Sequence, residues 1–386
     1  MTYRGLTWDH PRGRDPLVAA AGRVNKGHKE PLIEWHTQPL EGFESAPIDA
    51  LAQHYDLLII DHPHVGKAVA KRCLMALDTC FSHDQLALWE KQSVGPSFAS
   101  YNWPDASGTP TQWALPLDVA TQVMARRPDR LAEPPASWDD LVAAAQQYAV
   151  AQSLAGPHAF LTLLSMVAAF GAVPGGEGLF ADAPALLALE TMQQLYALRP
   201  AGSEALNPIA MCEAMADGSI DCVGLIFGYV NYADAHLSNA IAFSNSIGVG
   251  EADTGGVLGG TGLAISARCT PNKDLLDHLA WLMKADVHTT MIPRHGGQPS
   301  ARVAWEDEGL NSRWNRFYAN CLTTAERACV RPRFDGYIAF QTIAAERIRQ
   351  ALRAREDPER TLDTLRGLWR DARSHAVGPL HPARAA

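Results

Sequence analysis

Cysteine is sparse and scattered in this chain of 386 residues. The seven cysteines are odd in number and never occur in Cys-x-x-Cys spacing. A disulfide framework needs an even set of cysteines in an exported chain, and a thiolate zinc site needs closely spaced pairs. The pattern therefore indicates neither a disulfide scaffold nor a cysteine-based zinc site.

Long apolar runs are also absent. The start, MTYRGLTWDHPRGRDP, turns polar too soon for a secretory signal, which needs an apolar stretch of about 7 to 15 residues. The longest apolar candidate, LTLLSMVAAF, is shorter than the roughly 18 residues of a membrane helix and predicts a buried helix. We therefore expect a soluble cytoplasmic protein without membrane insertion, whereas a misassigned start would make it periplasmic.

Positive charge is in deficit. The chain carries 33 Lys and Arg against 42 Asp and Glu, which gives a formal net charge of −9. Nucleic acids and anionic membrane surfaces favour basic faces, so neither is expected as a partner. The sequence also contains no G-x-S-x-G, H-E-x-x-H or G-x-x-x-x-G-K motif. A small-molecule ligand is the expected partner.

The composition that is present belongs to an ordinary globular protein. The chain is 47% hydrophobic and 19% charged, and it is longer than a single hydrophobic core usually organises. Strand and helix patterns alternate along it, which is typical of an α/β protein with a largely parallel sheet. Two α/β lobes are therefore expected.

The individual elements follow from short apolar runs and from helical periodicity. The predicted strands are 3–8, 31–37, 56–62, 219–229 and 257–266. The predicted helices are 15–25, 48–55, 138–154, 182–198 and 271–285, with two more at the C-terminus. Ser137 is the expected N-cap of the 138–154 helix, and Asp357-Pro358 is expected to open the last helix.

One tripeptide occurs twice, each time after a predicted strand, as Asp9-His10-Pro11 and as Asp61-His62-Pro63. Ligands of open parallel sheets bind outside the carboxyl ends of the strands, so both turns are candidate ligand loops. In the alternative interpretation each Asp caps the next helix and each Pro opens it. Capping does not require the histidines, so the two interpretations differ mainly over His10 and His62.

Seven segments, some of them paired, follow one another in a known order. They are DLLIIDHPHVG, CLMALD, WALPLDVATQVMARRPDRL with PPASWDDL, AMADGSIDCVGLIFGYVNYA, VLGGTGLAIS with PNKDLLDHLAWLM, HGGQPSARVAW and RPRFDGYIAFQTIAAERIRQAL. Over nearly the whole chain this order resembles the family 1 extracellular solute-binding proteins, the sugar-binding class of ABC-transporter receptors related to maltose-binding protein. The resemblance implies an α/β, bilobal periplasmic-binding-protein-like fold of type II, with two mixed sheets flanked by helices and a ligand cleft between the lobes.

The resemblance also implies how the chain divides and what it does. The first lobe would comprise 1–113 and 258–310, and the second lobe 114–257 and 311–386, with crossing segments near 114, 257 and 310. The implied function is capture of a polar small molecule, namely a sugar, a sugar derivative or an organic acid. The implied protein partner is the permease of an ABC transporter. We expect a monomer with no cofactor and no bound metal.

The resemblance places ligand-binding residues in the turns after strands, at the return crossing between lobes and in the GGQP segment. The candidates are Trp8, Asp9, His10, Arg12, His36, Asp61, His62, His64, Tyr101, Phe227, Tyr229, Tyr232, Gly260, Thr261, His295 and Gln298. Aromatic faces would stack on sugar C–H surfaces, although each aromatic could instead serve core packing. Arg12 and the histidines, if they face the cleft, would favour a ligand with an acidic group.

An alternative function is a cytoplasmic enzyme built on the same fold. His62-x-His64, with His10, His295 and the aspartates, offers side chains that bind transition metals, although the spacing matches no metal signature. Histidines gathered at one cleft would also suit acid–base chemistry, because their pKa lies near neutrality. A binding protein returns its ligand unchanged, whereas an enzyme consumes it.

Overall fold

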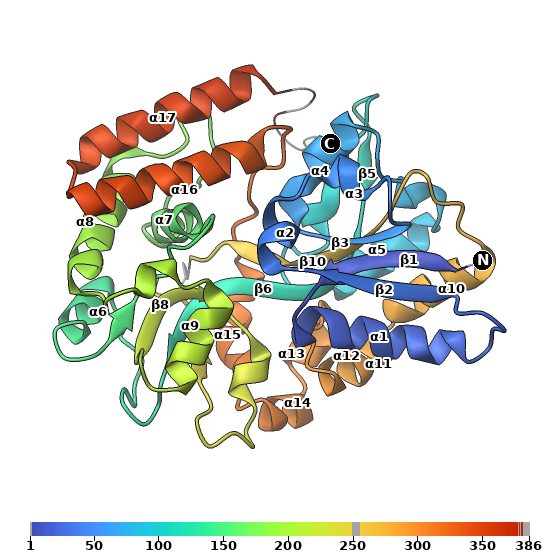
Figure 1. Cartoon of the computed structure of the whole chain (residues 1–386), viewed down its shortest axis with the longest axis horizontal. Coiled ribbons are helices and arrows are strands. Elements are labelled where there is room, and N and C mark those ends of the chain that lie inside the picture. The colour runs from blue at the N-terminus through green and yellow to red at the C-terminus, as the bar shows by residue number, and fades with distance from the viewer. Residues whose placement is uncertain (1, 249–254, 377, 379, 381–386) are drawn as a thin grey trace.

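The computed structural model of the chain describes residues 2–248, 255–376, 378 and 380. Two lobes lie side by side (Figure 1). One lobe holds the first strands and helix α1 (Pro11–Asn25), and the other holds the long C-terminal helices α16 (Tyr337–Ala354) and α17 (Pro358–Ser374). Strand β6 (Leu115–Arg126) runs from one lobe into the other (Figure 1). The expected bilobal α/β fold is thereby confirmed.

The strands form mixed sheets. The strands besides β6 are β1 (Tyr3–Trp8), β2 (Ile33–Gln38), β3 (Leu57–Ile60), β4 (Asn102–Pro104), β5 (Pro110–Gln112), β7 (Val150–Ala151), β8 (Cys222–Phe227), β9 (Ala242–Ser244) and β10 (Leu258–Ile265). The main order is β2-β1-β3-β10-β6-β8-β7, with β9 also paired to β6, while β4 and β5 pair separately. Strand β1 is parallel to β2 and β3, whereas β10 is antiparallel to β3 and β6.

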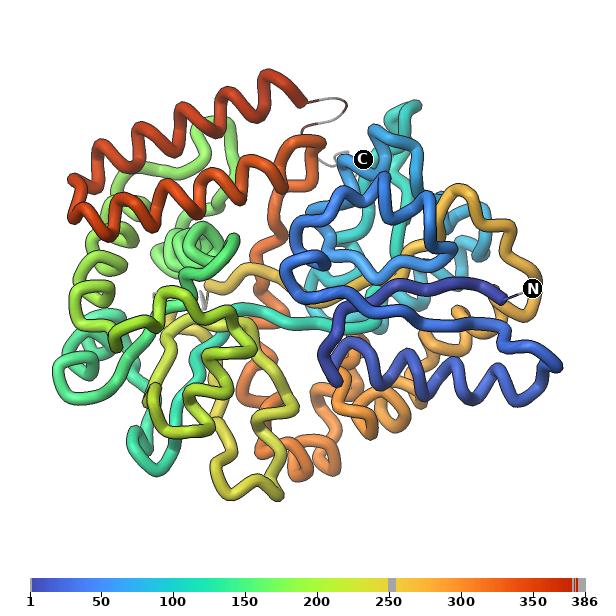
Figure 2. The backbone as a smooth tube through the Cα atoms, viewed as in Figure 1, coloured from blue at the N-terminus to red at the C-terminus, as the bar shows by residue number. Residues whose placement is uncertain are grey.

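Strand β6 belongs to the sheets of both lobes. Its residues up to Thr121 pair with β10, and its residues from Gln122 onward pair with β8 and β9. All of its residues except the last are buried. The backbone tube in Figure 2 shows this strand passing without a break through the boundary between the lobes. The change of sheet therefore falls inside β6, and the lobe boundaries near 114, 257 and 310 stay a prediction.

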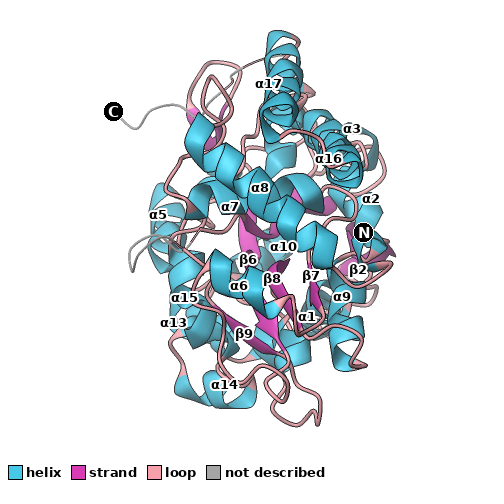
Figure 3. Ribbon diagram, turned by 90° about the vertical axis from the view of Figure 1, so that its left-hand side faces the viewer, coloured by secondary structure: helices cyan, strands magenta, loops and turns pink. Residues whose placement is uncertain are grey.

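Helices surround the strands of both lobes (Figure 3). Besides α1, α16 and α17 they are α2 (Leu40–Ser45), α3 (Ile48–Leu51), α4 (Val65–Ala70), α5 (His83–Gln92), α6 (Trp138–Ala144), α7 (His158–Ala169), α8 (Asp182–Leu198), α9 (Pro208–Ala216), α10 (Lys273–Leu282), α11 (Ala285–Thr289), α12 (Met291–Arg294), α13 (Arg302–Trp305), α14 (Glu308–Arg313) and α15 (Phe317–Glu326). Within the described ranges, none of the helices combines the length and apolar character of a membrane span.

Local sequence signals account for the elements that the sequence predicts best. Helix α8 has the predicted bounds, and α17 begins directly after Asp357, whose carboxylate accepts the backbone N–H of Glu359 at 2.8 Å. Strand β3 is buried along its whole length, as an apolar run without alternation indicates. The apolar run LTLLSMVAAF lies almost entirely in α7, which is buried on nearly every side. These predictions are confirmed.

Two predicted helices are much longer than the helices observed. Two others differ less: α1 begins at Pro11 rather than at residue 15, and α10 covers only Lys273–Leu282 of the predicted 271–285. Ser137 caps α6 as predicted, because its hydroxyl oxygen accepts the N–H of Asp140 at 3.1 Å, but the helix ends at Ala144. The chain then forms β7, which pairs in parallel with β8 and satisfies backbone groups that a longer helix would have bonded internally. The helix predicted at 48–55 likewise covers only α3. Tertiary pairing and turns override helical propensity at both places.

Candidate functional site

A cavity of about 50 Å³ lies between the two lobes. The first lobe contributes the ends of β1 and β3 and helix α2, and the second lobe contributes the starts of α7 and α9 and the segment after β8. Strands β6 and β10 complete the wall. The lining residues are Trp8, Arg12, Leu40, Phe43, Glu44, Asp61, Ala120, His158, Pro208, Phe227, Tyr229, Gly259, Gly260 and Thr261.

Aromatic rings form much of this wall. The ring of Trp8 lies 6.0 Å from the rings of Phe43 and Tyr229, measured between centroids; it stacks on Phe43 and meets Tyr229 edge-on. Phe227 closes against Gly259, where an added Cβ would lie 2.5 Å from the phenylalanine ring. Only glycine therefore leaves room for Phe227. Such rings present flat apolar faces of the kind that C–H groups of a polar ligand can cover.

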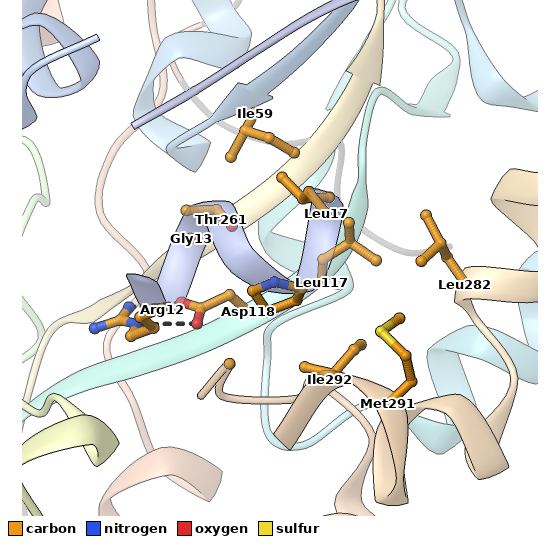
Figure 4. Close-up of a pocket in the computed structure, with 12 residues that line it drawn as sticks. Arg12, Gly13, Leu17, Ile59, Leu117, Asp118, Thr261, Leu282, Met291 and Ile292 are labelled. Carbon is orange, nitrogen blue, oxygen red and sulfur yellow. Dashed lines mark hydrogen bonds and ion pairs between the residues drawn. The ribbon is translucent and has the colours of Figure 1, made fainter. Parts of the chain in front are cut away.

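Arg12 lines the cavity, but its charge is taken up within the protein. Its Nε and Nη2 donate to the two carboxylate oxygens of Asp118 at 2.9 and 2.5 Å, and Nη1 donates to the Gly228 carbonyl oxygen at 2.9 Å. Figure 4 shows the guanidinium beside the Asp118 carboxylate. The guanidinium also lies over the rings of Tyr229 and Trp8. Arg12 therefore ties α1 to β6 and to the second lobe.

Asp61 lines the cavity after β3 and is also paired. Nη2 of Arg331 donates to both of its oxygens, at 2.7 and 2.5 Å, and His62 Nδ1 lies 3.2 Å from Oδ1. Burial would raise the pKa of Asp61, but the charge of Arg331 and the hydrogen bonds from His62 and Arg331 lower it below its ordinary value. Asp61 is therefore ionised at neutral pH, with Arg331 as its counter-charge.

The first Asp-His-Pro turn caps a helix in an unexpected way. His10 Nδ1 accepts the backbone N–H of Arg12 at 3.1 Å and so caps α1, while the His10 ring stacks on Trp8 at 5.2 Å. Asp9, the expected cap, instead pairs with Arg14 near the surface at 2.6 Å. The idea that capping leaves His10 without a role is therefore wrong, because an imidazole nitrogen can accept the same backbone N–H as a carboxylate oxygen.

The second turn places its histidines behind the cavity. His62 Nε2 accepts the backbone N–H of Arg331 at 3.2 Å, and burial, helped by the charge of Arg331, lowers the His62 pKa to about 4. His64 is buried and lines a separate groove beside α16. In the described part of the chain, no three His, Cys, Asp or Glu side chains are arranged to hold a metal ion.

Some of the predicted residues reach the wall and others do not. Those in the wall are Trp8, Arg12, Asp61, Phe227, Tyr229, Gly260 and Thr261. Those outside it are Asp9, His10, His36, His62, His64, Tyr101, Tyr232, His295 and Gln298. The Tyr101 hydroxyl donates to the Ile60 carbonyl oxygen, and the Gln298 amide joins Val119 of β6 to Val230 of the second lobe. These side chains support the cavity from behind.

Three more of the predicted residues lie farther from the wall. The ring of His36, on β2, lies 5.7 Å from the ring of Tyr55. The Tyr232 hydroxyl donates to the Glu213 carboxylate at 2.5 Å, and half-buried His295 follows the end of α12. None of these three side chains is among the residues that line the cavity.

Sequence reasoning missed the part of the wall where the two lobes touch. The missed residues are Leu40, Phe43, Glu44, Ala120, His158 and Pro208. His158 Nε2, at the start of α7, lies 3.1 Å from Glu44 Oε1 on α2, and Asn207 Nδ2 donates to Glu41 Oε1 at 3.2 Å. Both contacts cross from one lobe to the other. No local pattern signals them, because these residues become neighbours only when the lobes meet.

A second cavity of about 20 Å³ lies on the other side of Arg12, inside the first lobe (Figure 4). Its lining is mostly apolar and includes Pro16, Leu17, Ile59, Leu117, Leu282, Met291 and Ile292. A space of this size holds about one water, and a buried water needs polar partners. We therefore regard this cavity as a packing gap and the cavity between the lobes as the candidate site.

Two α/β lobes that enclose a small cavity at the ends of their strands define a bilobal solute-binding fold. Residues 48–301 match the family described as bacterial extracellular solute-binding proteins, and the chain belongs to this family. A search of the curated proteins found no match.

Solved structures share the fold over nearly the whole chain. An ABC-transporter solute-binding protein from Agrobacterium radiobacter, in complex with ribitol, is 18% identical, with 96% of this chain and 98% of that chain covered and a TM-score of 0.78. Maltose-bound MalE3 of T. maritima is 15% identical, with 96% and 99% covered and a TM-score of 0.79. An Agrobacterium vitis solute-binding protein with bound D-mannitol is 14% identical, with 98% and 100% covered and a TM-score of 0.75.

Proposed function

We propose that this protein captures a polar small molecule, in the first place a sugar or polyol, in the cavity between its lobes. In this proposal it delivers the ligand to the permease of an ABC transporter. The family is one of solute-binding proteins, and structures with the same fold were solved with ribitol, maltose and D-mannitol. The lobes would move about the crossing segments near 114, 257 and 310.

The main support for this proposal is that both lobes contribute side chains to the cavity wall. Trp8, Phe43 and Glu44 come from the first lobe, and His158 and Tyr229 come from the second. A molecule in the cavity therefore touches both lobes at once and stabilises their closed arrangement. Aromatic faces next to carboxylate and imidazole groups suit a ligand with C–H surfaces and hydroxyl groups.

A thermal-shift screen of sugars, polyols and organic acids tests the proposal. A ligand present at a hundred times its Kd should stabilise the folded protein by about 2.7 kcal/mol. Phe43→Ala should weaken the binding of each hit, whereas Leu88→Ala, at an exposed position outside the cavity, should leave it unchanged. Mass spectrometry should recover every hit unchanged. The absence of any hit, or consumption of the ligand, would contradict the proposal, and consumption would support the enzyme alternative.

The compartment decides whether a transporter is within reach. The family description is extracellular, and a transport role requires the protein to lie outside the cytoplasm. Cell fractionation with an antibody against the chain separates the two expectations. Recovery outside the cytoplasm agrees with delivery to a permease, whereas recovery only in the cytosol would rule out the transport role and leave a binding protein without a transporter.

A further inference from the structure

The charges at the cavity wall restrict which ligands can enter. Arg12 and Asp61 line the cavity with opposite charges, and each has its counter-charge inside the protein. Arg12 is held by both oxygens of Asp118, and Asp61 is held by Arg331. An incoming carboxylate would have to compete with Asp118 for a guanidinium that is only 4% exposed. Arg12, the cation that the sequence suggested for binding acidic ligands, is therefore already paired with Asp118.

The neighbouring histidine offers no positive charge either. His10 stacks on Trp8 behind the wall, and burial together with the charge of Arg12 lowers its pKa to about 3. Its Nδ1 accepts the backbone N–H of Arg12, which requires that nitrogen to be unprotonated. His10 is therefore neutral at physiological pH and gives no attraction to an anion.

Glu44 differs from the other two charged lining residues, because its partner is not a permanent cation. Its Oε1 lies 3.1 Å from Nε2 of His158, which is only 1% exposed. Nδ1 of His158 is buried and has no hydrogen-bond partner among the described residues. A carboxylate in a poorly solvated wall repels a ligand carboxylate and accepts hydrogen bonds from ligand hydroxyl groups.

We infer that the cavity takes an uncharged polyol or sugar and rejects organic acids. Glu44 is the residue that selects against negative charge. This inference rests on the proposed function and narrows it. It reverses the expectation, drawn from Arg12 and the histidines, that an acidic group would favour binding.

Isothermal titration calorimetry with matched ligands tests the inference. Mannitol and mannonate, and likewise ribitol and ribonate, share a carbon chain and differ by one terminal carboxylate. Each polyol should bind at least about a hundredfold more tightly than its acid. Glu44→Gln should reduce the preference for the polyol at least tenfold, because the repulsion of the acid disappears.

Glu41→Gln is the matched control, because Glu41 lies on the same helix and contacts the second lobe but does not line the cavity. It should change the affinities for polyol and acid by the same factor. Equal binding of mannitol and mannonate would overturn the inference and leave the proposed function standing. An equal loss of both ligands in Glu44→Gln would overturn the selective role of Glu44. Failure of every sugar, polyol and acid to bind would instead overturn the proposed function.

Discussion

Replacing Arg12 by methionine removes one half of an ion pair that lies at the junction of the lobes. The side chains of Arg12 and Asp118 are only 4% and 7% exposed, and Arg12 also donates to the Gly228 carbonyl oxygen. The variant Arg12→Met leaves the Asp118 carboxylate buried without its counter-charge. Breaking a buried pair in this way costs about 3–5 kcal/mol of the free energy of unfolding.

Urea unfolding followed by circular dichroism measures this loss. The double variant Arg12→Met with Asp118→Asn removes the stranded charge, so it should recover about 1–3 kcal/mol relative to Arg12→Met alone. If Arg12 served mainly to bind an anionic ligand, Arg12→Met would weaken ligand binding with little loss of stability. A loss below about 1 kcal/mol, or no recovery in the double variant, would refute the reasoning.

Three further predictions concern stability and closure. Burial lowers the pKa of His278 from 6.5 to about 4. The neutral imidazole therefore makes its full contribution to the free energy of unfolding above pH 6.5. Between pH 6.5 and pH 4 that free energy falls by about 1.4 kcal/mol for each pH unit of acidification. Urea unfolding at several pH values should show that the free energy of unfolding depends less steeply on pH in His278→Gln than in the unaltered protein. Thermal unfolding should show that Gly66→Ala costs about 1–3 kcal/mol or more, because its Cβ would lie 1.5 Å from a backbone carbonyl oxygen; Gly367→Ala, in open space within α17, should gain about 0.5–1 kcal/mol. Small-angle scattering should show a larger radius of gyration when His158 and Asn207 are both replaced by alanine; an unchanged radius would mean that these contacts do not hold the lobes together.

The sequence predicts a helix or strand well when the signal for it lies in neighbouring residues. The apolar run at β3 and the Asp-Pro start of α17 act on their own neighbours, so both could be read from the chain. The end of α6 could not be predicted in this way, because the residues that follow it form β7, which pairs with β8, a strand far along the chain. Helical propensity is a weak preference that such pairing overrides.

The residues of the candidate site show the same difference between local and distant signals. Trp8 is the last residue of β1, and Asp61 directly follows β3 of the same sheet. Ligand sites form at the carboxyl ends of such strands, so the place of both residues in the wall was predictable. Glu44 and His158 belong to different lobes and meet only through the arrangement of the whole chain. The chemistry of Arg12 was also hidden, since nothing near it in the sequence indicates that Asp118 neutralises it.

Strand β6 has a consequence for any attempt to separate the lobes. Its first part completes hydrogen bonding for β10, and its second part does so for β8 and β9. A fragment cut on either side of this strand would expose a row of unpaired backbone groups on one sheet. Exposed strand edges of this kind are templates for aggregation. Each lobe should therefore be difficult to produce alone, and fragments should regain solubility when they are expressed together and the edge is paired again.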